Sequence, residues 1–342
     1  MTEAYAVLVY SDGPLACAAA VLGASLRRHD PARARVAIVR DLSLSTRQIL
    51  THDGLWTLHD AADSKHERKY IKALKRKNEL WRLTQYSRVL YLDADSFLLP
   101  DAAGKPGVRG ARLQRLWSQY QLTGSVKLAA TGVRPNYYNE STTRANTCFN
   151  GGLLLLRPDV ATADALDAID AHKLRMRGEE RRRCPGYDQP LLNNHFREWQ
   201  RIGYTYIRSI THWLATPAFP RTCGLSTREA LLQAADAYHF FHKAWPWENT
   251  YCDLCVTSGH RCKSVVPIHD ECAVQSIANQ LWWQELRQAL PPNGTAKCLK
   301  LTEQETAASV PAAVAAKPLT RAKLRGAMCT GCANRPTMAC VP

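Results

Sequence analysis

The sequence has no apolar run long enough to cross a membrane. Its longest apolar stretches are interrupted within about a dozen residues, whereas a membrane-spanning helix needs about 20. The amino terminus enters a strand-like run almost at once, which is unlike a secretory signal peptide. We therefore expect a soluble, cytoplasmic protein, or one in the Golgi lumen if an anchor upstream of this sequence has been removed.

Acidic residues are few beside basic ones. The chain has 30 Asp and Glu against 45 Lys and Arg, which gives a formal net charge of +15. Such a charge attracts anions, including nucleic acid, anionic lipid, acidic polysaccharide and nucleoside diphosphates. Basic runs such as Lys75-Arg76-Lys77 are more often solvated faces than binding sites, and the sequence has no recognisable nucleic-acid-binding module. We expect no nucleic-acid partner.

Cysteine is scarce before residue 250, where four of the twelve lie, and the other eight follow from Cys252 onward. The question of oxidation therefore concerns the carboxyl-terminal part of the chain. Cys252-x-x-Cys255 and Cys329-x-x-Cys332 are compatible with disulfides in an oxidising compartment or with a structural zinc site. We favour disulfides, because the spacings after the first pair fit no standard zinc module.

What the sequence does contain is an alternation of strand-like and helix-like segments. This alternation predicts βαβ units, and hence an α/β fold with a mainly parallel central sheet flanked by helices. The expected strands are 4–10, 35–39, 55–58, 88–92, 126–131, 153–156 and 237–241. The expected helices are 16–26, 45–52 with Ser45 as N-cap, 65–86, 113–120, 159–172 and 271–290, and a linker-like stretch is expected at 302–325.

The stretch from Arg88 to Ser96 is an apolar strand that ends in two carboxylates, Asp93 and Asp95. Functional residues gather at the carboxyl ends of strands in such sheets. Because side chains alternate in extended backbone, both carboxylates would project to the same side. Two hard oxygen donors so placed suit Mg²⁺ or Mn²⁺, with phosphate oxygens completing the coordination. The competing interpretation is a surface turn, which Asp and Ser favour.

Three further motifs have a functional and a structural interpretation. Asn150-Gly151-Gly152 allows close approach of the backbone to a ligand, but it is also typical of a simple bend. Asp188 precedes a helix with Pro190 in its first turn, where it would serve as the N-cap. His239 lies in a predicted strand, and a lone histidine there is usually structural.

Five separated pieces of the chain, taken in order, resemble the glycogenin-like glycosyltransferases of family 8, which take a sugar from a nucleotide-sugar donor. The pieces are Val21–Leu26, Leu80–Tyr86 leading into Leu92–Asp95, Phe149–Gly152, Asp188-Gln189, and His239-Phe240 through Pro246-Trp247. The resemblance covers roughly residues 4–250. It implies the GT-A nucleotide-diphospho-sugar transferase fold and a transfer that retains the anomeric configuration.

The resemblance also implies the site. A metal ion, Mn²⁺ or alternatively Mg²⁺, would be held by Asp93, Asp95 and His239 and would stabilise the charge that develops on the departing UDP. The positions implied to contact the UDP-sugar are Leu8, Tyr10 and Ser11 for uridine, Ala94 in the metal motif, and Asn150 and Gly151 near the sugar. Lys243 does not occupy the position of the family's phosphate-binding lysine, but it would reach the phosphates by a different loop path. The implied catalytic residues are Lys77, Asp188 and Gln189. Without the resemblance, Lys77 would be read as a solvated charge on a basic helix.

The resemblance leaves two mechanisms open. In one, the acceptor attacks from the same face and the leaving phosphate takes its proton. In the other, a covalent glycosyl intermediate forms on a carboxylate, for which Asp188 is the candidate. The chain also departs from the family where Trp245 replaces a lysine that contacts the diphosphate and where Gly151 replaces the usual serine. These departures imply weakened donor binding, altered donor choice or loss of activity.

The expected function is transfer of a hexose, foremost from UDP-glucose, to a carbohydrate, lipid or protein hydroxyl. The alternatives are UDP-glucuronic acid or UDP-galactose transfer to a polysaccharide or glycolipid, a catalytically weak UDP-sugar-binding module, and an Asp-x-Asp phosphatase. A homodimer is compatible with the family. Residues 1–250 are expected to form the catalytic domain, 251–300 a cysteine-rich segment with a helix, and 301–342 a linker-like, cysteine-containing tail.

Overall fold

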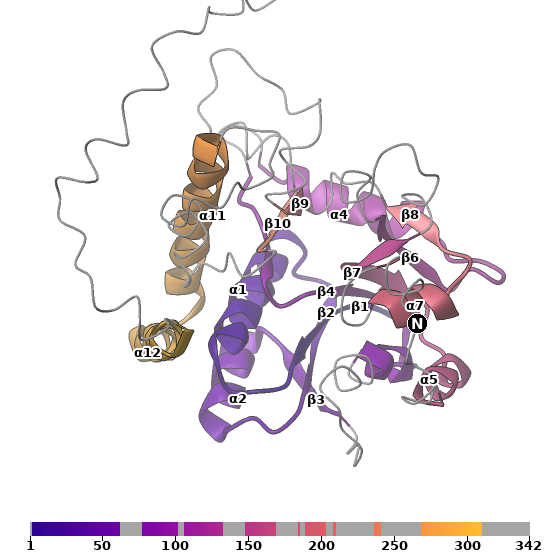
Figure 1. Ribbon diagram of the computed structural model, residues 1–342, viewed down its shortest axis with the longest axis horizontal. Helices are drawn as coiled ribbons and strands as arrows, with labels where there is room; N and C mark the ends of the chain where they lie inside the picture. Colours follow the sequence, from indigo (N-terminus) through magenta and orange to yellow (C-terminus); the bar gives the residue numbers. More distant parts are fainter. Residues whose placement is uncertain are drawn as a thin grey trace, which may run out of the picture.

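The computed structural model describes residues 2–61, 77–101, 106–132, 148–168, 184, 189–202, 208–209, 236–240 and 268–309. Its centre is a seven-stranded sheet with the strand order β3-β2-β1-β4-β7-β6-β8 (Figure 1). In that order the strands are Thr57–Asp60, Ala34–Val39, Thr2–Val9, Tyr86–Leu92, Phe149–Leu156, Leu128–Gly132 and Gln200–Ile202. The predicted α/β fold with a central sheet flanked by helices is confirmed.

The sheet is mainly parallel, with one strand reversed. β1 pairs in parallel with both β2 and β4, and β2 does so with β3. β7 runs antiparallel to its neighbours β4 and β6. This reversal brings the start of β7 beside the end of β4, where Leu92 pairs with Leu153. The Asn150-Gly151-Gly152 segment therefore lies next to the carboxylates that follow β4.

Helices cover both faces of the sheet and bury two separate cores. One core contains residues of α1 (Pro14–His29), α2 (Leu44–Thr51), α4 (Val108–Gln119) and α11 (Ile268–Ala289). The other contains residues of the 3-10 helix η2 (Glu79–Arg82), α5 (Val160–Asp167) and α7 (Gln189–His195). Along β1, Tyr5 and Val7 enter the first core while Ala4 and Ala6 enter the second. Burial on both faces explains the continuous apolar character of these strands.

A second, three-stranded sheet lies against α1. It has the order β5-β10-β9, with β5 at Ser96–Leu98, β10 at Ala237–His239 and β9 at Arg208–Ser209. β5 follows β4 after only a short turn, so the two sheets are joined at the Asp93–Asp95 segment. Phe97 of β5 stacks on Phe240 with ring centroids 5.8 Å apart. This packing fixes β10 against β5.

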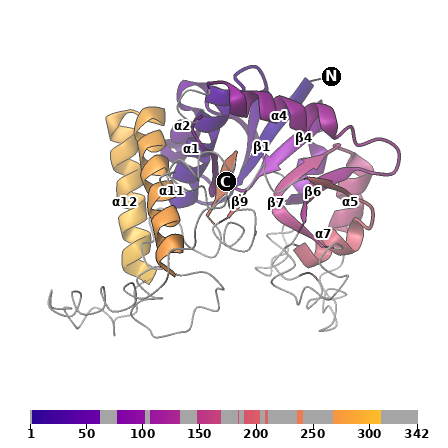
Figure 2. The ribbon, with the colours of Figure 1, turned by 90° about the horizontal axis from the view of Figure 1, so that it is seen from above.

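Two carboxyl-terminal helices pack on α1. α11 and α12 (Pro292–Ser309) lie outside α1, on the side opposite α5 and α7 (Figures 1 and 2). A disulfide joins Cys17 of α1 to Cys298 of α12, and Arg28 forms an ion pair with the buried Glu285 of α11. Within the described part of the chain, no helix is both long and apolar enough to span a bilayer.

Several expected elements differ from the observed ones. The α2 N-cap is Ser43, whose hydroxyl accepts from the Thr46 N–H, and not Ser45. A helix continuing to Tyr86 is wrong, because that residue already belongs to β4. The glycine segment expected to be a turn lies inside β7, where antiparallel pairing keeps it extended. Residues 302–309, expected to be a linker, continue α12, which packs on α1 and α11.

The expectation that oxidation concerns the carboxyl-terminal part of the chain is incomplete. The structure contains the Cys17–Cys298 disulfide and a second one between Cys148 and Cys184. Three of these four cysteines precede residue 250. Spacing could not reveal the first pair, because its partners meet only when α12 packs on α1. Cys252, like the other cysteines from 223 to 262 and from 329 on, lies outside the described residues.

The Cys17–Cys298 disulfide should contribute strongly to stability. It joins residues 281 positions apart, and closing so long a loop restricts the unfolded chain. We expect the Cys17→Ser/Cys298→Ser variant to lose about 2–5 kcal/mol of unfolding free energy, measured by denaturant titration without reductant. The Cys148→Ser/Cys184→Ser variant, whose loop spans only 36 positions, is the matched control and should lose about 1–2 kcal/mol less. Equal stability of the first variant and the wild type would contradict this account.

Candidate active site and metal centre

Asp93 and Asp95 lie in a tight turn between β4 and β5. The turn closes with a hydrogen bond of 3.0 Å from the Ser96 N–H to the Asp93 carbonyl. The Asp93 N–H donates to the Gly152 carbonyl at 3.0 Å, which extends the β4–β7 pairing by one step. The two carboxylates do come to the same side, but by the turn and not by the strand alternation that we expected. The predicted strand does end just before Asp93, and the competing prediction of a turn at this position is also correct.

His239 reaches this turn through β10. In the antiparallel pairing of β10 with β5, His239 lies directly opposite Ser96. The next residue, Phe240, donates its N–H to the Asp95 carbonyl at 2.9 Å. The aromatic packing of β5 against β10 therefore places the imidazole of His239, which is distant in the sequence, beside the two carboxylates.

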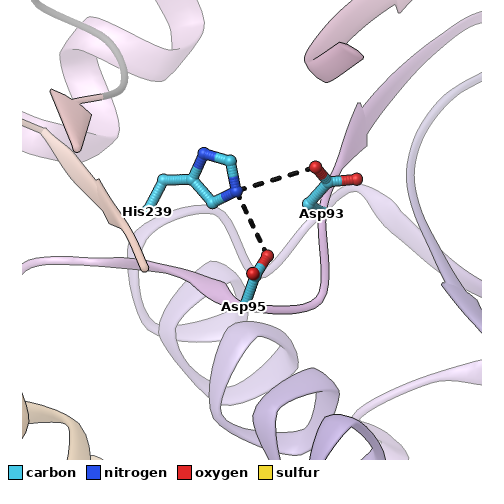
Figure 3. A group of neighbouring side chains, drawn as sticks. All are labelled: Asp93, Asp95 and His239. Carbon is cyan, nitrogen blue, oxygen red and sulfur yellow. Dashed lines mark ion pairs between the residues drawn. The ribbon is translucent and has the colours of Figure 1, made fainter. Parts of the chain in front are cut away.

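The three side chains converge on one point (Figure 3). His239 Nε2 is 3.2 Å from Asp95 Oδ1 and 3.6 Å from Asp93 Oδ2. One possible ligand atom from each residue lies within 4.8 Å of the other two. The His239 side chain is 9% exposed, whereas the two carboxylates are 28% and 18% exposed. The group is thus held from the protein side and is open on the carboxylate side.

The charges of this group favour a cation between the carboxylates. Burial lowers the pKa of His239, but the charges of Asp95 and Asp93 and the hydrogen bond to Asp95 outweigh it, so the pKa is raised. A proton on the imidazole thus partly offsets two negative charges. A metal ion bound by the neutral imidazole would offset the two carboxylate charges more completely. Its binding would release the proton from the imidazole.

Lys77 lies at the edge of this group and is almost completely buried. Its ammonium group donates to the Gly151 carbonyl at 2.9 Å and is 3.4 Å from Asp93 Oδ1. The segment that carries it is fixed by Trp81, which stacks on Phe196 in the second core with ring centroids 5.1 Å apart. The interpretation of Lys77 as a solvated surface charge is therefore wrong.

The Asn150-Gly151-Gly152 segment forms the wall beside Asp93. The Asn150 side-chain oxygen accepts from the Gly152 N–H at 2.7 Å. A Cβ on Gly152 would lie 2.8 Å from His239 Cε1 and 3.1 Å from Asp93 Oδ2. Glycine is required here by close approach to the side chains of the carboxylate–histidine group, and not by backbone strain.

Hydrogen bonds of the Asn193 side chain link α7 to the start of β7. The Asn193 amide accepts from the Phe149 N–H at 2.7 Å and donates to the Phe149 carbonyl at 3.0 Å, and it also donates to the Gln189 carbonyl at 2.8 Å. Gln189, at the first position of α7, is thereby held near the residue that precedes Asn150. Asp188 and its expected N-cap role lie outside the described residues, as do Lys243 and Trp245.

The predicted uridine-binding positions lie at the carboxyl end of β1 and directly after it, at the same edge of the sheet. Leu8 and Tyr10 are partly buried against the second core, and Ser11 is exposed. Because β1 and β4 are parallel neighbours, the carboxyl end of β1 and the Asp93 turn share an edge. The Asp12 carboxylate accepts from the Ser43 N–H at 3.0 Å and so links the loop after β1 to the start of α2.

Three residues of the site were not assigned roles from the sequence. Gly152 stands out in the sequence only as part of a motif, although its lack of a Cβ makes room for His239. Tyr91 stands two residues before Asp93, a spacing that could have indicated a shared face. Asn193 gave no signal, because its role depends on the packing of α7 against β7.

Comparison with known proteins agrees with this geometry. No protein-family model matches the chain. Glycogenin-1 of Oryctolagus cuniculus is 25% identical over 272 residues, which cover 73% of this chain and 67% of that protein. Glycogenin-1 of Homo sapiens is 26% identical over 267 residues, which cover 73% of this chain and 64% of that protein.

Two solved structures share the fold. One is the galactosyltransferase LgtC in complex with donor and acceptor sugar analogues, with a TM-score of 0.52, 14% identity, and coverage of 86% of this chain and 99% of LgtC. The other is the glycosyltransferase GlyE of Streptococcus pneumoniae TIGR4, with a TM-score of 0.52, 15% identity, and coverage of 90% and 64%. The expected GT-A architecture is confirmed.

The chain is a glycosyltransferase, and it is similar to glycogenins over most of its length. The Asp-x-Asp phosphatase interpretation is thereby excluded. In this glycosyltransferase the carboxylates that follow β4, the histidine of β10 and the glycine segment of β7 meet at one edge of the central sheet, which is where α/β proteins bind their ligands.

Proposed function

We propose that this glycosyltransferase moves a hexosyl group from a UDP-sugar, foremost UDP-glucose, to a hydroxyl acceptor on a carbohydrate, lipid or protein. The observation that carries the proposal is the convergence of Asp93, Asp95 and His239 at the sheet edge, in a chain similar to glycogenins over most of its length. Residues 1–250 would supply this chemistry as the catalytic domain. UDP-galactose and UDP-glucuronic acid are the alternative donors.

We propose that Asp93, Asp95 and His239 bind Mn²⁺, with Mg²⁺ as the alternative. Two carboxylates and an imidazole suit Mn²⁺, whereas Mg²⁺ prefers oxygen ligands. The two carboxylates support the fit, because the negative charge that raises the pKa of His239 would also stabilise a metal ion between them. When bound, the ion would neutralise charge on the diphosphate of the departing UDP.

The other residues would bind and orient the donor. Lys77 would place a second positive charge beside the diphosphate, and the Asn150 and Gln189 segments would border the transferred sugar. Asp93 and Asp95 both face His239 and would hold the metal ion, which would make them poor candidates for a nucleophile. We therefore favour same-face attack with retention of configuration. A covalent intermediate on Asp188 is the alternative.

A panel of UDP-sugars tests the proposed function. The purified chain is incubated with UDP-glucose, UDP-galactose or UDP-glucuronic acid, with Mn²⁺, with Mg²⁺ or with excess EDTA, and released UDP is measured. We expect the most UDP from UDP-glucose with Mn²⁺ and almost none with EDTA. Binding of UDP without release from any donor would indicate a binding module and overturn the proposal of catalysis.

A further inference from the structure

Tyr91 is a buried residue of β4 that contacts the metal centre without belonging to the proposed ligand set. It is 2% exposed and pairs with Leu154 of β7 on one side and Ala6 of β1 on the other. Its hydroxyl donates a hydrogen bond to Asp93 Oδ1. The strands on both sides hold the tyrosine backbone in place, so the hydroxyl is a fixed donor for this carboxylate.

The two oxygens of Asp93 have different surroundings. Oδ1 accepts from the Tyr91 hydroxyl and lies 3.4 Å from Lys77 Nζ. Oδ2 lies 3.6 Å from His239 Nε2 and faces the other members of the carboxylate–histidine group. One oxygen is therefore held by the protein, and the other is directed toward the point where a cation would bind.

The ring of Tyr91 also borders Lys77. The Lys77 ammonium group lies 5.0 Å from the ring centroid, within the range of a cation–π contact, and donates to the Gly151 carbonyl at 2.9 Å. Tyr91 thus contacts two charged groups of opposite sign. Its hydroxyl orients the carboxylate, and its ring supports the lysine beside that carboxylate.

We propose that Tyr91 is a positioning residue that fixes the rotation of the Asp93 carboxylate so that Oδ2 faces the metal ion. This inference rests on the proposed function, since it presumes a cation between Asp93, Asp95 and His239. Hydrogen bonds to ligating carboxylates orient them and strengthen metal binding. Without the hydroxyl, the carboxylate is free to rotate, and the Lys77 ammonium group can engage either of its oxygens in competition with the metal.

The Tyr91→Phe variant tests the role of the hydroxyl, because it keeps the ring that packs in the core and borders Lys77. Mn²⁺ binding is measured by electron paramagnetic resonance of the free ion, with and without UDP. We expect the Mn²⁺ dissociation constant to rise about tenfold. We also expect excess Mn²⁺ to restore most of the turnover from UDP-glucose, whereas a purely structural defect would not respond to the metal concentration.

Tyr5→Phe is the matched control. Tyr5 is also a buried strand tyrosine, and its hydroxyl donates to a carboxylate oxygen of Asp30 at 2.6 Å in the first core, whereas Tyr91 belongs to the second core. It should lower the melting temperature and leave the Mn²⁺ dissociation constant unchanged. A Tyr91→Phe constant within twofold of the wild type would overturn the positioning role and leave the proposed function intact. Wild-type protein that binds no Mn²⁺ under either condition would overturn both.

Discussion

Replacing Asp95 with Asn should lower UDP release from UDP-glucose at least about 100-fold. The substitution keeps the shape of the side chain but removes one of the two negative charges that would hold the metal. It also removes the ion pair with His239, whose Nε2 lies 3.2 Å from Asp95 Oδ1. Mn²⁺ binding, measured by titration of the free ion, should weaken in parallel with activity.

A charge control separates this effect from a general change in electrostatics. Asp164 forms an ion pair with Arg82 at 2.9 Å, and its side chain is 61% exposed. Asp164→Asn removes the same charge from the protein surface, so we expect wild-type activity and little change in stability. Full turnover by Asp95→Asn, or by the wild type in excess EDTA, would show that the group does not act through a metal.

Gly152→Ala should damage the same centre by crowding it. The added Cβ would stand 2.8 Å from His239 Cε1, 2.9 Å from Asn150 Oδ1 and 3.1 Å from Asp93 Oδ2. Two of these distances are shorter than carbon atoms tolerate, and His239 is packed too tightly to move without losing its place between the carboxylates. We expect turnover to fall about 100-fold, the usual consequence of displacing a catalytic group by about 1 Å.

Gly294→Ala provides the comparison for this variant. The nearest atom to a Cβ on Gly294 is Leu290 Cβ at 3.4 Å, which is an ordinary van der Waals contact, and the residue lies in the first turn of α12. Its activity and Mn²⁺ affinity should match those of the wild type. A Gly152→Ala protein that binds Mn²⁺ and releases UDP normally would contradict this crowding, because it would show that the β7 segment can shift to accommodate the added Cβ.

The layered fold could be predicted because its signals are local. Strands buried on both faces are continuous apolar runs, and α1 is rich in alanine and begins with Pro14. The reversed direction of β7 could not be predicted, because pairing direction depends on how the chain returns to the sheet. The same limit applies to the Cys17–Cys298 disulfide, whose partners meet only through helix packing.

The site was predicted in part. Asp93 and Asp95 are conspicuous because two carboxylates one residue apart follow a buried apolar strand, and in the structure both lie beside His239 Nε2. His239 could be assigned only through the resemblance, since nothing in its own segment distinguishes it from a structural histidine. The burial of Lys77 against Tyr91 and Gly151 could not be predicted, because it arises from tertiary packing. Asp188 and Lys243 stay predictions, because the structure does not describe them.

The most direct test of the central claim is the position of Mn²⁺ in crystals grown with Mn²⁺ and UDP. We expect one strong anomalous scattering peak within coordination distance of Asp93, Asp95 and His239 Nε2, with diphosphate oxygens on its open side. Bound UDP with no such peak, or a peak held by other residues, would contradict this claim.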